Sequence, residues 1–200
     1  MKKAVLYIHG KGGSAAEADH YKELFTSYEV IGLDYKTNTP WETGQEISEA
    51  VDKLSDTYEE IVLIANSIGA FFSMNGNIDD KINRAFFISP IVNMEKLITD
   101  MMSWANVTEE DLQEKKYIET EFGENLSLEY LSYVRKHPII WNVRTDILYG
   151  DKDNLTAIHT IKEFAEEHNA SLIIMEQGEH WFHTEEQMTF LDNWIRTNLS

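Results

Sequence analysis

The sequence has no cysteine, and it has only 3 prolines and 10 glycines among its 200 residues. A chain without cysteine has no disulfide bond, no thiolate metal ligand and no cysteine nucleophile. The small share of glycine and proline excludes a collagen-like or low-complexity chain. Hydrophobic residues make up 42% of the sequence, and a chain of this length with that composition can bury its own core. We therefore expect a single globular domain over residues 1–200.

Positive charge is scarce. The 17 Lys and Arg residues are outnumbered by 35 Asp and Glu residues, and the formal net charge is −18. Such a chain is repelled by the phosphates of nucleic acids and by anionic membrane surfaces. We therefore expect neither as a partner. Nothing in these counts bears on the oligomeric state.

Long hydrophobic runs are also missing. The first run, Ala4–Ile8, stops at His9 and Gly10. A signal-peptide core needs about 7–15 apolar residues, and a membrane-spanning helix needs about 20. We interpret this run as the first strand of the domain, and we expect a cytoplasmic protein without a membrane span.

Short apolar runs are present instead, and each is continuous rather than alternating. They are Ala4–Ile8, Val30–Leu33, Ile61–Ala65, Ala85–Ile88, Ile147–Tyr149 and Leu172–Met175. Continuous runs of this length are typical of parallel strands that are covered on both faces. Segments with helical spacing lie between them. The alternation predicts a three-layer α/β fold of about six parallel strands, with helices on both faces of the sheet.

Capping patterns indicate where some helices begin. Thr43 with Glu46 forms a capping box in front of the apolar stripe that starts at Ile47, so we expect the first long helix to begin there. Thr184 with Gln187 opens the last amphipathic segment in the same way.

One stretch departs from the alternation of strands and helices. Residues 91–144 contain no clear strand, but they carry helical stripes such as the one formed by Leu97, Ile98 and Met101. A connection of this length needs structure of its own or a function. We expect a small helical insertion that forms a lid over the carboxyl edge of the sheet.

The strongest local signal surrounds Ser67. The run Ile61–Ala65 leads into Asn66-Ser67-Ile68-Gly69, which matches the nucleophile-elbow pattern G-x-S-x-G with Ala65 at the first glycine. The turn is so tight that the residues two before and two after the serine must approach each other and be small. The pattern therefore predicts an exposed hydroxyl on a strained turn. The alternative is that Ser67 only caps the helix that follows.

A serine hydroxyl needs a base to accept its proton. His180 follows the last apolar run, which would place it at the carboxyl edge of the sheet, where such a base is required. His183 is the nearest competitor, but its position beside the final helix suits a contact at the helix start. The two histidines could also form a metal-binding pair. Because no cysteine or suitably spaced carboxylate accompanies them, we expect no metal.

The base in turn needs a carboxylate to orient it. The run Ile147–Tyr149 is followed by Gly150 and by two candidates, Asp151 and Asp153. Spacing alone does not choose between them, and either one could instead be a turn residue or a helix cap.

A glycine-rich turn, His9-Gly10-Lys11-Gly12-Gly13, follows the first apolar run. The negative oxygen that develops in acyl transfer is stabilised by two backbone N–H groups, one of them directly after the nucleophile. We expect Ile68 to supply that donor and Lys11 to supply the other. His9 is expected to brace the turn rather than to act as a base.

Taken together, these segments resemble the α/β-hydrolase superfamily, in its serine esterase and lipase branch. The resemblance covers essentially the whole chain, because the segments follow one another in the family's order. They are His9-Gly10, the Ser67 turn, the insertion, Gly150-x-x-Asp153 and Gly178-x-His180. Ala65, in place of a glycine, is a departure from the family pattern.

The resemblance implies particular roles. It favours Asp153 over Asp151 as the carboxylate and His180 over His183 as the base, and it also implies Lys11 as the first oxyanion donor. A carboxylesterase-like serine hydrolase would follow, without a cofactor, in which Ser67 forms an acyl-enzyme with a small to medium ester.

Two alternatives come from other classes. A hydrolase-shaped protein can be a ligand-binding or signalling protein with little turnover, because fold does not dictate function. The segment Gly10-x-Gly12-x-x-Ala15, with Asp34 after the second run, also fits a relaxed dinucleotide-binding fingerprint. That interpretation leaves Ser67, Asp153 and His180 unexplained.

Overall fold

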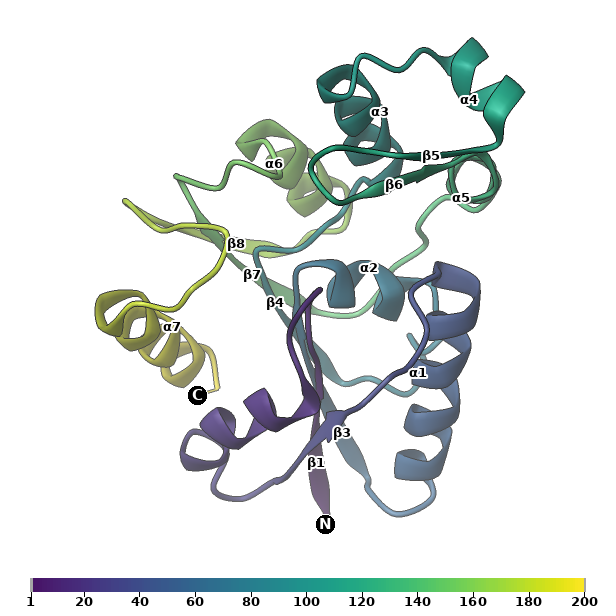
Figure 1. The fold of residues 1–200 in the computed structure, drawn as a ribbon. Coiled ribbons are helices and arrows are strands. Elements are labelled where there is room, and N and C mark those ends of the chain that lie inside the picture. Colours follow the sequence, from purple (N-terminus) through teal and green to yellow (C-terminus); the bar gives the residue numbers. More distant parts are fainter. Residues whose placement is uncertain (1, 200) are drawn as a thin grey trace. The chain divides into compact units, whose positions relative to one another are not determined.

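A computed structural model describes residues 2–199 of the chain. Its main sheet has six strands, all parallel, in the order β2-β1-β3-β4-β7-β8 (Figure 1). Their bounds are Lys3–Ile8 for β1, Glu29–Leu33 for β2, Glu60–Asn66 for β3, Arg84–Ile88 for β4, Thr145–Gly150 for β7 and Ser171–Met175 for β8. Each predicted apolar run lies in one of these strands, which confirms the six-stranded parallel sheet.

Helices cover both faces of this sheet, as the alternation predicts. They are η1 (Ala15–Glu23, a 3-10 helix), α1 (Pro40–Ser55), α2 (Ile68–Met74), α6 (Ile158–Glu167) and α7 (Glu185–Asn198). The core on one face joins strand residues such as Val5 and Val62 to Tyr21 of η1 and Trp194 of α7. In Figure 1, α1 lies on one side of the central strands and α7 on the other. The three-layer arrangement is therefore confirmed.

The predicted start of the first long helix is wrong by one turn. Helix α1 begins at Pro40, and the hydroxyl of its N-cap, Thr39, accepts the N–H of Glu42 at 3.3 Å. Proline suits the first helical position because its φ is preset and no N–H is needed there. Glu46 instead accepts backbone N–H groups from Lys36 and Thr37. The last helix begins as predicted, since Thr184 caps α7.

Strand β8 differs from the other strands in its exposure. It lies at the edge of the sheet and, within residues 2–199, pairs only with β7. Ile173 and Ile174 remain 43% and 40% exposed, although their run is as apolar as that of a central strand. A continuous apolar run therefore identifies the strand but not its place in the sheet.

Residues 93–140 form a compact unit of their own, separate from the unit made by residues 1–92 and 141–200. This smaller unit contains α3 (Met94–Trp104), α4 (Glu109–Lys115) and α5 (Leu128–Lys136). It also contains an antiparallel pair of strands that helical spacing does not indicate, β5 (Tyr117–Glu119) and β6 (Asn125–Ser127). These strands have three residues each, which is too short to show a period.

The turn between β5 and β6 is closed by a glycine and by hydrogen bonds of Thr120. Gly123 has φ +84°, a conformation that glycine adopts without steric cost. The N–H and the hydroxyl of Thr120 both donate to the carbonyl oxygen of Glu124. Leu126 of β6 is buried, as are Ile98 of α3 and Leu131 of α5.

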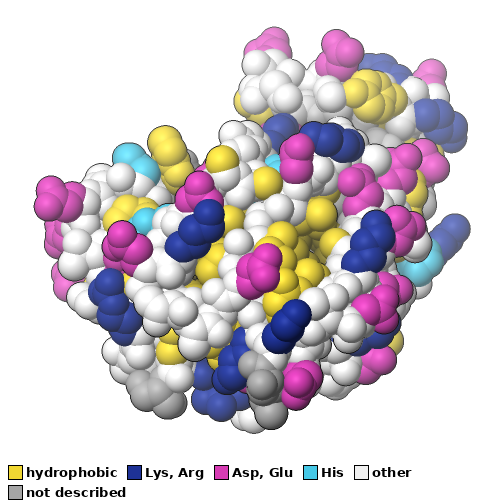
Figure 2. Space-filling view, turned by 90° about the horizontal axis from the view of Figure 1, so that it is seen from below, with side chains coloured by type: hydrophobic (Ala, Val, Ile, Leu, Met, Phe, Trp, Pro, Cys, Tyr) yellow, Lys and Arg dark blue, Asp and Glu magenta, His cyan; other side chains and the backbone are white. Residues whose placement is uncertain are grey.

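The surface carries both signs of charge. In the view from below in Figure 2, hydrophobic side chains gather near the centre, and Asp, Glu, Lys and Arg are interspersed around them. Among residues 2–199, no helix is long and apolar enough to cross a membrane.

Candidate active site

Ser67 lies between β3 and α2 in a strained conformation. Its φ is 53° and its ψ is −120°, a region that costs a non-glycine residue energy and is concentrated at functional sites. Its N–H donates to the carbonyl of Ile88 at 2.9 Å, and its carbonyl accepts the N–H of Ile91 at 3.1 Å. The hydroxyl makes no capping bond to α2. The interpretation of Ser67 as a mere helix cap therefore fails.

Gly69 lies closely against the end of β1. A Cβ at this position would lie 2.6 Å from the carbonyl oxygen of His9 and 2.7 Å from that of Ile8. The end of β1 therefore leaves no room for a side chain at this position. This close contact presses the start of α2 against the turn that follows β1.

His180 connects two side chains from distant parts of the sequence. Its Nε2 lies 2.8 Å from the Oγ of Ser67, and its Nδ1 lies 2.6 Å from the Oδ2 of Asp153. The side chain of His180 is 19% exposed, whereas that of Asp153 is fully buried. A buried carboxylate next to Nδ1 favours the tautomer with the proton on that nitrogen, and Nε2 is then the nitrogen that can accept a hydrogen bond from the serine hydroxyl.

The two candidate aspartates have different partners. Besides His180, Asp153 accepts the N–H groups of Leu155 and Thr156 through its Oδ1, at 2.8 and 3.0 Å. Asp151 accepts the N–H of Gln177 at 2.8 Å. Asp153 therefore faces the histidine, whereas Asp151 braces the turn after β8.

His183, the other histidine considered as a base, makes different contacts. The ring of His183 stacks on Trp181 with centroids 4.4 Å apart, and its Nδ1 donates to the carbonyl of Trp181 at 2.7 Å. Its backbone N–H donates to the Oε1 of Gln187 at 3.1 Å. Among the described residues, no three His, Asp or Glu side chains gather as metal ligands.

The turn after β1 is held by its own side chains. The carbonyl of Gly10 accepts the Nδ1–H of His9 at 2.8 Å and the N–H of Gly13 at 3.1 Å. The N–H of the same peptide unit belongs to Lys11, and in a trans peptide the N–H points opposite to the carbonyl. His9 therefore braces the turn, and its bond orients the N–H of Lys11.

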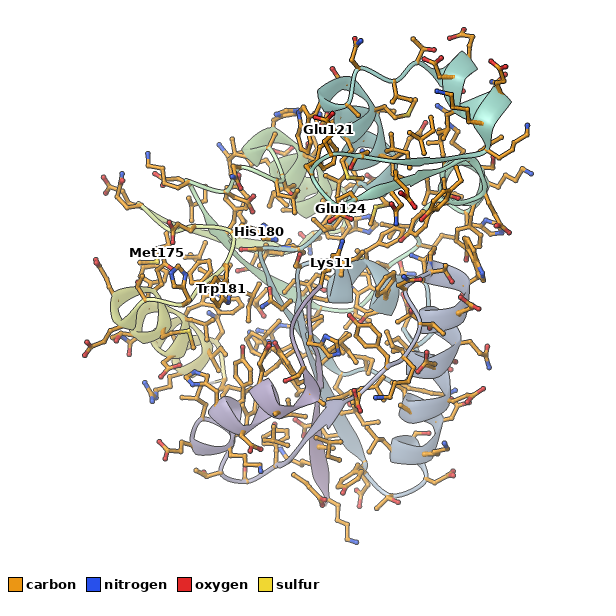
Figure 3. All side chains as sticks on the ribbon, viewed as in Figure 1. Lys11, Glu121, Glu124, Met175, His180 and Trp181 are labelled. Carbon is orange, nitrogen blue, oxygen red and sulfur yellow. The ribbon has the colours of Figure 1, made fainter. Side chains whose placement is uncertain are left out.

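The same turn lies directly against the elbow. A Cβ on Gly10 would be 3.1 Å from the Cβ of Ser67. Figure 3 shows Lys11 and His180 over the same end of the main sheet, on the loops that follow β1 and β8. Ile68 is the first residue of α2. The two segments expected to supply oxyanion donors thus both adjoin Ser67.

The dinucleotide interpretation is disfavoured by the charge at the start of η1. Glu17 accepts the N–H of Ser14 at 3.0 Å and the hydroxyl of Tyr7 at 2.6 Å. A pyrophosphate would need the N–H groups at this helix start, but a carboxylate already occupies the position. Asp34, the acidic residue of the dinucleotide-binding fingerprint, forms an ion pair with Lys36.

Sequence reasoning missed two groups of residues that hold this site. The first is Ile88 and Ile91, whose backbone groups bond to Ser67. The second is Tyr35, which contacts His9. Neither has a local signal, because each contact joins segments that are distant in sequence.

No protein-family model matches the chain, and no curated protein matches its sequence. Solved structures do match it. Est1E from Butyrivibrio proteoclasticus has a TM-score of 0.76 at 15% identity, over 99% of this chain and 86% of its own. Alpha/beta hydrolase domain-containing protein 10 from mouse has a TM-score of 0.76 at 16% identity, over 98% and 89%.

The Est2 esterase of Thermogutta terrifontis gives a similar result. Its TM-score is 0.68 at 15% identity, over 100% of this chain and 82% of its own. Together with the strand order, these matches show that the chain has the α/β-hydrolase fold. The resemblance seen in the sequence is therefore confirmed at the level of the fold.

Proposed function

We propose that the protein is a serine hydrolase that cleaves small to medium carboxylic esters through an acyl-enzyme on Ser67. The observation that carries this proposal is the hydrogen-bonded series from Ser67 through His180 to Asp153, with distances of 2.8 and 2.6 Å. A nucleophile, a base and an orienting carboxylate within hydrogen-bond reach are what acyl transfer requires.

The reaction begins when the Oγ of Ser67 attacks the ester carbonyl carbon and its proton passes to the Nε2 of His180. Asp153 stabilises the resulting imidazolium. The carbonyl oxygen becomes an oxyanion, which accepts hydrogen bonds from the N–H groups of Lys11 and Ile68. His180 then donates its proton to the departing alcohol, and the acyl group stays on Ser67.

A water molecule completes the cycle. His180 accepts a proton from the water as it attacks the acyl carbon. The second tetrahedral species collapses, the proton returns to Ser67, and the carboxylic acid is released. No step requires a metal or a cofactor.

The structural neighbours support esters as the first substrates to test. Est2 of Thermogutta terrifontis has also been solved with propionate and with butyrate bound, and these structures match this chain at TM-scores of 0.65 and 0.66 with 17% identity. Short acyl esters, such as p-nitrophenyl propionate and butyrate, are therefore the appropriate first panel.

We also propose that residues 93–140 serve as a lid. The support is their compactness as a separate unit and their point of insertion, which follows the carboxyl end of β4. The backbones of Ile88, at the end of β4, and of Ile91, shortly before the insertion, bond to Ser67.

The decisive experiment is intact mass after incubation with a fluorophosphonate, followed by peptide mapping. A single adduct on Ser67 is expected in the wild-type protein, and Ser67→Ala should give none. Ser55→Ala is a matched control, because Ser55 is an exposed serine whose hydroxyl donates to the carbonyl of Asp52. Failure of the wild-type protein to react would contradict the proposal.

Turnover provides a second criterion. Ser67→Ala should lose a factor on the order of 10³ or more in kcat on an activated ester. Wild-type turnover no greater than that of Ser67→Ala would instead favour a ligand-binding or signalling protein of the same shape.

A further inference from the structure

Tyr35 lies just after β2 and makes three contacts at the carboxyl end of the sheet. Its hydroxyl donates to the carbonyl of His9 at 3.0 Å. Its ring stacks on the ring of His9, with centroids 4.1 Å apart and planes 7° from parallel. Its ring also meets Phe72 edge to face at 5.9 Å. Burial raises the pKa of Tyr35 to about 12, so the hydroxyl remains a donor at neutral pH.

These contacts act on the turn that carries Lys11. The ring of His9 donates to the carbonyl of Gly10, and that peptide unit also contains the N–H of Lys11. A ring clamped by stacking holds this bond in one direction. Tyr35 therefore constrains two successive carbonyls, that of His9 directly and that of Gly10 through the His9 ring.

Tyr35 also contacts the helix that carries Ile68. Phe72 lies on α2, one turn after Ile68. The His9 carbonyl that accepts the Tyr35 hydroxyl is the group that would lie 2.6 Å from a Cβ at Gly69. The tyrosine thus touches both segments expected to donate to an oxyanion.

The tyrosine is itself held in place from α1. The carboxylate of Glu46 accepts the N–H of Lys36 at 3.0 Å and the N–H of Thr37 at 3.0 Å, and it also accepts the Thr37 hydroxyl. Lys36 and Thr37 follow Tyr35 directly, so the segment has little freedom to move the ring away from His9.

We propose that Tyr35 is a positioning residue for the oxyanion hole. It keeps the N–H of Lys11 directed at the same oxygen position as the N–H of Ile68. This inference rests on the proposed function. It assigns to Tyr35 no contact with the substrate, and its effect passes through His9 and α2.

The test compares Tyr35→Phe with Tyr58→Phe. Each change removes one hydroxyl that donates one hydrogen bond, because Tyr58 donates to Glu29 near the opposite end of the sheet. The probes are p-nitrophenyl butyrate and 1,1,1-trifluorohexan-2-one. In the second, the Oγ of Ser67 adds to the ketone carbon, its proton passes to His180, and the ketone oxygen becomes an oxyanion that is not turned over.

Tyr35→Phe is expected to lower kcat/KM by roughly tenfold, since removal of a whole oxyanion donor costs about 10²–10³. It should weaken binding of the ketone by the same factor and leave the melting temperature and the shape of the pH profile as in Tyr58→Phe. If Tyr35 only supported the fold, kcat/KM and the affinity for the ketone would not fall by the same factor.

Two results would overturn the inference. One is a Tyr35→Phe protein that matches Tyr58→Phe with both probes. The other is a loss of kcat/KM without weaker binding of the ketone. These results differ from a failure of the proposed function, in which the wild-type protein itself shows no Ser67-dependent turnover and both proposals fall.

Discussion

Gly150 and Gly178 pack backbone against backbone, and a Cβ on Gly150 would lie only 2.3 Å from the carbonyl oxygen of Gly178. That carbonyl also accepts the N–H of Lys152 at 2.8 Å. The loops after β7 and β8 therefore touch at a point where no side chain fits. Asp153 lies three residues beyond one glycine and His180 two beyond the other, so the contact brings these side chains together.

Gly150→Ala should consequently impair both stability and activity. The added methyl group forces the two loops apart, and overpacking of this kind costs about 1–3 kcal/mol. We expect kcat to fall even at temperatures where the variant is still folded, because Asp153 moves away from His180. Gly123→Ala is a useful contrast, since no atom lies within 4 Å of a Cβ there and only its φ of +84° opposes the change. Equal activity of the two variants would refute the proposed role of the glycine contact.

Asp153→Asn and Asp151→Asn form a matched pair. Loss of the carboxylate at position 153 should lower kcat by a factor on the order of 10⁴, because the histidine then adopts the wrong tautomer. The same change at Asp151 removes only a charge that accepts the N–H of Gln177, so kcat should change by less than about tenfold. Steady-state kinetics on one activated ester decides between them. A reversed order would show that Asp151 is the orienting carboxylate.

Activity should decline toward acid pH. The proposed base, His180, can accept the proton of Ser67 only when its ring is neutral, because an imidazolium has no lone pair to offer. A profile of kcat/KM from about pH 5 to 8 should therefore rise with pH and level off. His183→Gln should leave the profile unchanged, because its ring stacks on Trp181. A flat wild-type profile would argue against His180 as the base.

Glu46 should make stability depend on pH below neutrality. Burial by itself raises its pKa, but the hydroxyl of Thr37 and the N–H groups of Lys36 and Thr37 outweigh that effect, so the pKa is lowered in the folded protein. A lowered folded pKa contributes stability above the unfolded value, near 4.5, and this contribution is lost as pH falls through the folded pKa.

Glu46→Gln should therefore reduce the free energy of unfolding by about 1–2 kcal/mol at pH 7. The difference from the wild-type protein should shrink toward pH 3. Urea denaturation at pH 7, 5 and 3.5 measures it. Gln45→Ala is a neighbouring control, because the amide of Gln45 donates to Glu49 on the exposed side of α1. A difference that does not vary with pH would contradict the assignment.

Local patterns in the sequence predicted the main strands and helices better than they predicted helix starts and short strands. Apolar runs located all six strands of the main sheet. Burial on both faces accounts for the continuous runs of β1, β3, β4 and β7, whereas β8 has such a run although Ile173 and Ile174 are exposed. Thr184 located the start of α7 because an N-cap acts over three residues. The pattern at Thr43 failed because Thr39 and Pro40, one turn earlier, supply a better start. Strands β5 and β6 left no period to recognise.

Some features of the candidate site could also be predicted from local sequence, and others could not. The small residues around Ser67 and the position of His180 after an apolar run were readable, because the tight turn and the strand end are local features. The roles of these residues remain predictions. The choice between Asp151 and Asp153 was not readable from spacing, and neither was the contact of Tyr35 with His9.

The sequence by itself therefore determined which segments are strands and helices and which residues carry reactive groups at strand ends. Only the tertiary structure decided which of these groups meet. Ser67 and His180 are separated by 113 positions, and Asp153 and His180 by 27. Their distances depend on the order of strands in the sheet and on the backbone contact of Gly150 with Gly178. Strand order is a property of long-range packing, and no short stretch of sequence contains it.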